Sequence, residues 1–130
     1  MAKKKEPINV TPKENNEVLV NANRIKVVVM FNGDNVICDL QEAVDKTTNQ
    51  RQAYIFNFPY KVDYERPNTG GATGRVEDPE VKVHYSPWCP LSPENRIAIN
   101  HTMVVTILEP VPSLRDTYIT NVRQMGGNVA

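Results

Sequence analysis

The sequence predicts an all-β protein, a small five-stranded and strongly bent barrel with a long loop between strands three and four and a short C-terminal helix. Three observations lead to this fold class. β-Branched residues flank the turn Asn32-Gly33, aromatic residues alternate along residues 52–64, and residues 95–110 are rich in Ile, Val and Thr. A chain of 130 residues supports one domain with a modest core. About five short strands suit a small barrel better than a sandwich.

The first two strands are predicted to form a hairpin. Residues 25–31 lead into Asn32-Gly33, residue types that adopt positive φ at little cost, and residues 36–44 return. A short helical turn before Ile25 is also compatible with the sequence. In the second strand two sets of residues alternate, which predicts one core face and one largely wet face. The two sets are Val36, Cys38, Leu40 and Ile37, Asp39, Gln41.

The third strand covers residues 52–64 and follows a polar loop, residues 45–51. Pro59 has no N–H to donate, so the strand should be bent or at a sheet edge there. Alternation predicts that one face of this strand carries its largest side chains. These are Tyr54, Phe56, Phe58, Tyr60 and Val62.

The remaining elements lie beyond a stretch rich in Gly and Pro. A further strand within residues 80–92 is broken by Pro87 and Pro90, and residues 95–110 are predicted to form two short strands with a bend near Asn100-His101. Ser113 and Asp116 form a helix-start signal, and Gly126-Gly127 ends the helix. The expected parts are a Lys-rich flexible arm at 1–17, a barrel at 18–112 with a flexible excursion at 65–80, and a helix and tail at 113–130.

Charge and composition restrict the class of partner. Fifteen basic and fifteen acidic side chains give zero formal net charge, so any nucleic-acid binding has to be local. No apolar run approaches the roughly 18 residues of a membrane span, and residues 1–7 lack the apolar segment of a signal peptide. We therefore expect a cytoplasmic chain without membrane contact. Cys38 and Cys89 are expected to be free thiols.

Motifs for catalysis and cofactors are missing from the sequence. Residues 70–74 are rich in Gly but follow a polar linker, which favours a flexible loop over a phosphate-binding loop. Asp39 with Glu42 is predicted to be a solvated strand face rather than an acid/base pair. The four His and Cys side chains do not pair at the spacing of a zinc site, so no metal is expected. Without a metal site or a catalytic motif, no cofactor and no enzymatic activity are expected either. The four side chains are His84, His101, Cys38 and Cys89.

Two segments carry a resemblance to Sm-like proteins, the Sm/LSm/Hfq superfamily. Residues 27–45, VVVMFNGDNVICDLQEAVD, resemble the first motif of this family, with Gly33 at the turn glycine and Asp45 at the loop aspartate. Residues 96–110, RIAINHTMVVTILEP, resemble the second motif in the form found in bacterial Hfq. Over residues 25–118 the chain is most similar to Sm-like proteins assigned to cyanophages.

The resemblance implies a small SH3-like barrel that forms a homo-oligomeric ring. In such rings the fourth strand of one subunit pairs with the fifth strand of the next, a head-to-tail contact between exposed edges. The segments that correspond here are residues 82–88 and 103–109. The expected interface residues are Val83, Tyr85, Trp88, Met103, Val105 and Ile107.

The resemblance also implies that single-stranded RNA binds at the pore of the ring. The expected contacts are Asp45, Asn49, Asn100 and His101, with Lys3, Lys4 and Lys5 adding attraction for phosphate. Thr47 and Thr48 stand where the family usually has a residue that stacks on a base. The alternative function is a non-enzymatic phage structural or assembly protein whose barrel and arm contact other phage proteins. The chain is accordingly expected in the host cytoplasm, and in the virion for the alternative function.

Overall fold

The computed structural model describes residues 19–65 and 82–130. Most of them lie in strands, which are antiparallel apart from one short parallel pair, so the predicted all-β class is confirmed. The expected arm, residues 1–17, and nearly all of the expected excursion, residues 65–80, lie outside the described residues. None of the helices in the described segments has the length and apolarity needed to cross a membrane.

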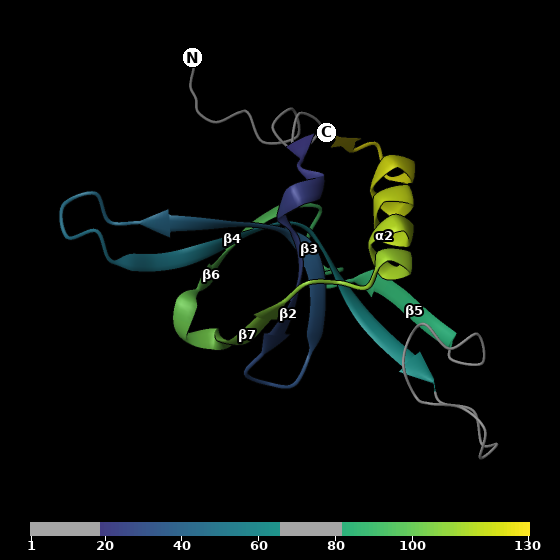
Figure 1. Ribbon diagram of the computed structural model, residues 1–130, viewed down its shortest axis with the longest axis horizontal. Coiled ribbons are helices and arrows are strands. Elements are labelled where there is room, and N and C mark those ends of the chain that lie inside the picture. The colour runs from purple at the N-terminus through teal and green to yellow at the C-terminus, as the bar shows by residue number, and fades with distance from the viewer. Residues whose placement is uncertain (1–18, 66–81) are drawn as a thin grey trace.

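A single antiparallel sheet organises the molecule (Figure 1). Its strands follow the order β5-β4-β3-β2-β7, and β6 also pairs with β4. Their bounds are β2 Ile25–Met30, β3 Asn35–Val44, β4 Arg51–Glu65, β5 Lys82–Pro87, β6 Arg96–Asn100 and β7 Val104–Leu108. The smaller elements are β1 Leu19–Val20, η1 Ala22–Arg24, η2 His101–Met103, α2 Pro112–Gln124 and β8 Asn128–Val129, with β1 and β8 forming the parallel pair.

Strands β5 and β6 share one side of the long strand β4. β5 pairs with its C-terminal half, from Tyr60 to Glu65, and β6 pairs with its N-terminal half, from Ala53 to Asn57. The bend predicted near Asn100-His101 is the 3-10 turn η2, which separates β6 from β7. Within the described residues the hydrogen-bonded sheet is open, with β7 at one end and β5 and β6 at the other. A closed five-stranded barrel therefore stays a prediction.

Both faces of the sheet carry an apolar core, which differs from the prediction for β3. Helix α2 covers one face through Leu114, Tyr118 and Val122, which pack with Ile37. The other face holds Val28, Met30, Val36, Cys38, Tyr54 and Phe56. The predicted wet face of β3 is wrong at the centre of the strand because α2 and its connections cover it.

A β-bulge explains why the aromatic residues of β4 do not share one face. Between the pairs Ile37↔Tyr60 and Asp39↔Asn57, β4 uses one residue more than β3. Phe58 has a positive φ of 51° at this point, which turns the strand. Tyr54 and Phe56 consequently enter one core, whereas Phe58, Tyr60 and Val62 enter the other. The bend expected at Pro59 is confirmed, and the single aromatic face is wrong.

The bulge is held by the C-terminal helix. The Tyr118 hydroxyl lies 3.0 Å from the carbonyl oxygens of both Asn57 and Phe58 and donates to them. Gly127 packs closely on the same region, because a Cβ there would lie 2.8 Å from Phe58 Cζ. The middle of α2 and the segment that follows the helix thus hold the bulge of β4.

The ends of α2 were partly predicted. Gly126 has a φ of +88°, and its N–H donates to the carbonyl of Arg123, as a glycine helix end requires. The start differs, since Val111 is the N-cap, Pro112 occupies the first turn and no side chain caps the helix. Ser113 lies inside the helix because Pro112 is favoured at its first position, so the predicted Ser113 cap is wrong.

Candidate binding pocket

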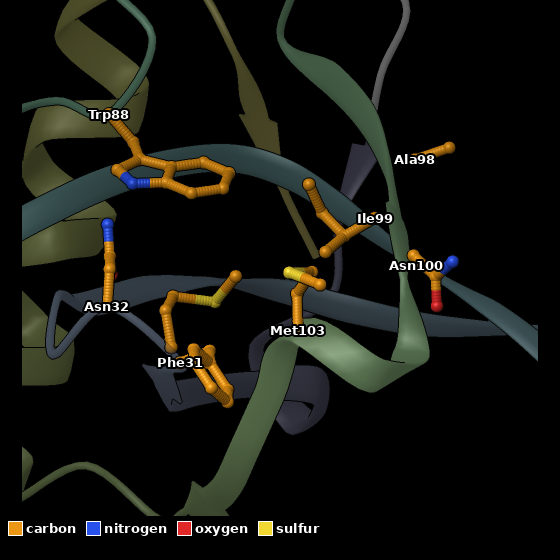
Figure 2. A pocket seen from close by; sticks show the side chains of 8 residues that line it. Phe31, Asn32, Trp88, Ala98, Ile99, Asn100 and Met103 are labelled. Atoms are coloured by element: carbon orange, nitrogen blue, oxygen red, sulfur yellow. The ribbon is translucent and has the colours of Figure 1, made fainter.

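An apolar pocket of about 330 Å³ opens between the turn after β2, the end of β6, η2 and Trp88. We call it the Trp88 pocket (Figure 2). It is lined by Met30, Phe31, Asn32, Trp88, Ala98, Ile99, Asn100 and Met103. The side chain of Phe31 is 76% exposed and that of Met103 is 47% exposed, although both are large and apolar. The pocket is therefore open to solvent.

Backbone hydrogen bonds fix the mouth of the pocket. The N–H of Gly33 donates to Met30 O, and the N–H of Met30 donates to Asp34 O, which closes the turn. Only Gly33 of this turn has a positive φ, +93°, as expected for a type I turn followed by a glycine bulge. The N–H of Phe31 donates to Met103 O at 2.8 Å and ties the turn to η2. The glycine turn predicted from Asn32-Gly33 thus forms one wall of the pocket.

The indole ring of Trp88 is oriented by a carboxylate. Its Nε1–H donates to Asp34 Oδ2 at 3.2 Å, and its backbone N–H donates to Pro59 O. The indole hydrogen bond is the main reason why the pKa of Asp34 lies below its ordinary value, with further contributions from Asn32 and Lys61. On the other side the indole packs on Phe56, with ring centroids 5.7 Å apart. Trp88 is therefore held in place between the pocket and the core.

The pocket is suited to an uncharged, apolar group. Figure 2 shows the side chains of Trp88, Ile99 and Met103 pointing toward one another, whereas those of Ala98 and Asn100 lie on the opposite side of β6. None of the lining residues is ionisable. The amide of Asn32 lies at one end, and its oxygen accepts the backbone N–H of Asp34. An occupant would thus gain mainly from burial of apolar surface.

The predicted RNA contacts fall in two loops. Asp45 and Asn49 lie in the β3–β4 loop, where Asp45 Oδ1 accepts the N–H of Thr47 at 2.8 Å and Asn49 has a φ of +59°. Asn100 and His101 lie at η2, where Asn100 Oδ1 accepts the N–H of Thr102 at 3.0 Å. Both Asp45 and Asn100 thus shape their own loops.

Strand pairing brings these two loops to the same end of β4. Asn100 lies opposite Ala53, two residues after the first residue of β4, and the β3–β4 loop immediately precedes that strand. The third predicted set, Lys3, Lys4 and Lys5, lies outside the described residues. Asn100 also borders the Trp88 pocket, which the sequence did not predict. Two features of the sequence could have indicated the pocket. Phe31 is a large apolar residue next to the glycine turn, and Trp88 lies between two prolines.

The predicted interface residues divide into three pairs. Val83 and Tyr85 pack against the core under α2, and the Tyr85 hydroxyl donates to Leu114 O. Ile107 and Trp88 pack partly on the opposite core. The other two, Met103 and Val105, remain exposed at 47% and 64%. These two have the largest free surface for a contact with another molecule.

The potential metal donors do not gather within the described residues, where no group of three or more His, Cys, Asp or Glu side chains is placed to hold an ion. His84 is exposed on β5 and contacts Glu65 at the neighbouring strand. Cys38 is buried, which raises the pKa of its thiol well above the ordinary value. Both cysteines are free thiols, as predicted.

Buried Asp39 differs from the predicted solvated strand face. Its two carboxylate oxygens accept from Nε and Nη2 of Arg24, each at 2.8 Å, and one also accepts the N–H of Asn21. Arg24 lies in η1, which is the short helical turn that the sequence allowed before Ile25. The carboxylate thus anchors η1 to the sheet, and the hydrogen bond raises the pKa of Arg24.

Comparison with protein-family models gives no match for this chain, and comparison with curated proteins gives none either.

Proposed function

We propose that this chain is a non-enzymatic, Sm-like assembly protein whose copies join through their sheet edges in a homo-oligomeric ring. The observation that carries the proposal is the open sheet, whose two ends each offer a strand with one unpaired side in the described residues. Such edges are templates for pairing with another chain. The outer strand β7 also exposes Val105 at 64% and Leu108 at 51%. Burial of these side chains between copies would favour the contact.

The order in which the strands pair supports the Sm-like proposal. β5 and β6 pair with consecutive parts of β4 in the same direction, so together they act as one strand interrupted by residues 88–95. Counted in this way, the sheet has five strands, with a 3-10 turn before the last one. That last strand, β7, returns to the first strand of the hairpin, β2. This order supports a strongly bent barrel without establishing its closure.

The edge contact is testable with charges on β7. We expect the variant Val105→Lys, Leu108→Lys to lower the affinity of self-association by more than about tenfold, because each lysine would have to be desolvated at the contact. Sedimentation velocity over a range of protein concentrations measures this change. Val44→Lys is the matched control, since Val44 is a similarly exposed strand residue at the far tip of β3. Equal self-association of the unmodified chain, the double variant and Val44→Lys would exclude the β7 edge as the contact.

Single-stranded RNA binding is a second candidate, favoured by the position of the β3–β4 loop and η2 at the same end of β4. Fluorescence anisotropy with U-rich and A-rich RNA at two salt concentrations tests it, because phosphate contacts weaken as salt rises. Asn49→Gly removes the amide and keeps the positive φ, so it should reduce binding, whereas Thr120→Ala on α2 should not. Absence of binding at low salt removes this candidate.

A further inference from the structure

We propose that the Trp88 pocket receives the side chain of Leu91 from a second copy of this chain. The inference rests on the proposed self-association and identifies a specific contact within it. It joins two features of the described surface, an open apolar pocket and a fully exposed apolar side chain. Neither feature is used by the fold of a single copy.

Leu91 projects from a rigid turn. Its side chain is fully exposed, with a relative accessibility of 101%. Pro90 and Leu91 occupy the centre of a turn in which the N–H of Ser92 donates to Cys89 O at 3.2 Å. Proline before the second central residue fixes the backbone of such a turn. Leu91 is therefore presented to solvent in a restricted conformation.

Both ends of the loop that carries Leu91 are attached to the bulge of β4. The N–H of Trp88 donates to Pro59 O, and the N–H of Phe58 donates to Asn95 O at 2.7 Å. A loop held at both ends loses little conformational entropy when its tip is bound. The same is true of the pocket, whose walls are joined by the bond from Phe31 N–H to Met103 O.

The pocket and the side chain match in charge and size. No ionisable residue lines the pocket, so an uncharged aliphatic group enters without desolvating a charge. Its volume of about 330 Å³ lies at the lower end of the range of about 300–1,000 Å³ for ligand sites, which suits one side chain and its neighbours. Leucine also meets sulfur and aromatic surfaces that adapt to its shape, those of Met103 and Trp88.

The other exposed apolar residues are poorer occupants. Val105 and Leu108 belong to the strand β7 and do not project from a turn. Met125 lies in the turn that ends α2, but at 61% it is much less exposed than Leu91. Phe31 is strongly exposed but already lines the pocket. Among the large apolar side chains of the described residues, Leu91 has the highest exposure. The contact joins two different surfaces, so each copy offers both and successive copies can close into a ring.

Disulfide trapping between two separately made variants tests the contact. One full-length chain carries Leu91→Cys, and a second chain with an added affinity tag carries Met103→Cys. Both also carry Cys89→Ser, while Cys38 is kept because it is fully buried. After mild oxidation we expect a disulfide-linked dimer of one tagged and one untagged chain. On a non-reducing gel its mass lies between those of the dimer of two untagged chains and the dimer of two tagged chains. Replacing Met103→Cys by Thr120→Cys on the exposed face of α2 should leave the mixed product at least about tenfold weaker.

Self-association of single variants provides the second measurement. We expect Leu91→Asp to weaken association at least about tenfold and Leu91→Met to stay within about threefold of the unmodified chain. Both variants should fold, because the side chain makes no buried contact.

The outcomes separate this contact from the proposed function. If the unmodified chain stays monomeric, both the assembly role and the Leu91 contact are overturned. If it associates, but Leu91→Asp associates equally well or the mixed disulfide is no stronger than the Thr120→Cys control, only the Leu91 contact is overturned. An unrelated protein or small apolar molecule in the pocket would give that second pattern.

Discussion

At the scale of single residues, the roles of two carboxylates, Asp39 and Asp34, could not be predicted from the residues next to them in the sequence. Asp39 alternates with apolar residues like any solvated strand position, yet it is fully buried. Its partner Arg24 comes from η1, so only the three-dimensional fold brings the charges together. Asp34 follows a glycine turn, as expected, but its hydrogen bond to Trp88 joins residues 54 positions apart. Such distant pairs cannot be read from the pattern of one sequence.

We expect Asp39→Asn to destabilise the fold by about 2 kcal/mol. The change removes the negative charge from a buried pair, but Arg24 is 38% exposed and water can partly replace the lost contacts. Urea unfolding measured by circular dichroism gives the free energy. The exposed Asp116→Asn variant is the control and should stay within about 0.5 kcal/mol of the unmodified chain. A value for Asp39→Asn as small as that of the control would contradict the anchoring role.

Acidification should release Trp88 from Asp34. Because the folded pKa of Asp34 is lowered from its ordinary value of 3.8, the ionised carboxylate contributes stability that is fully present above pH 3.8. This contribution is lost as the pH falls through the lower, folded pKa. Trp88 is the one tryptophan in the chain, so its fluorescence should titrate with a midpoint below pH 3.8.

The same titration has two controls. Asp34→Asn should abolish the fluorescence step, since no carboxylate remains to protonate beside the indole. Circular dichroism of the same samples separates local release from global unfolding. A midpoint above pH 3.8 in folded protein would show that the indole hydrogen bond does not stabilise the carboxylate.

At the scale of elements, the sequence predicted the strands better than the faces they present. The hairpin turn, the bend at Pro59 and the break at Asn100-His101 all follow from local backbone chemistry, and all are present. The sequence did not predict on which face each side chain of β4 lies, because one inserted residue at Phe58 reverses the alternation of the side chains. A bulge of this kind depends on Tyr118 of the distant helix, which holds its carbonyl groups.

The contact between the end of α2 and the bulge predicts the effect of Gly127→Ala. An added Cβ would lie 2.6 Å from Val122 Cγ1 and 2.8 Å from Phe58 Cζ, so the core would have to shift. We expect a loss of about 2 kcal/mol in thermal or urea unfolding. Gly33→Ala is the matched comparison, because its φ of +93° adds backbone strain of about 1 kcal/mol but nothing lies within 4 Å. A smaller loss of stability for Gly127→Ala than for Gly33→Ala would contradict the close packing at Gly127.

At the scale of the whole molecule, the sequence predicted a β-rich fold with a C-terminal helix, and the described residues agree. The Trp88 pocket was not predicted, because its walls come from four segments that only the folded sheet assembles. The predicted RNA contacts lie in two loops at one end of β4, and one of these loops, at Asn100 and η2, also borders the pocket. The described residues therefore combine open sheet edges with an apolar pocket, the two features on which the proposed self-association rests.

The intact mass of the full-length chain in solution tests the assembly role most directly. Native mass spectrometry should show one dominant species whose mass is a whole multiple, greater than two, of the 14.7 kDa chain. The same spectrum would reveal bound RNA as additional mass, which separates an RNA-loaded ring from an empty one. A single species at 14.7 kDa across the concentration range would contradict the proposed ring.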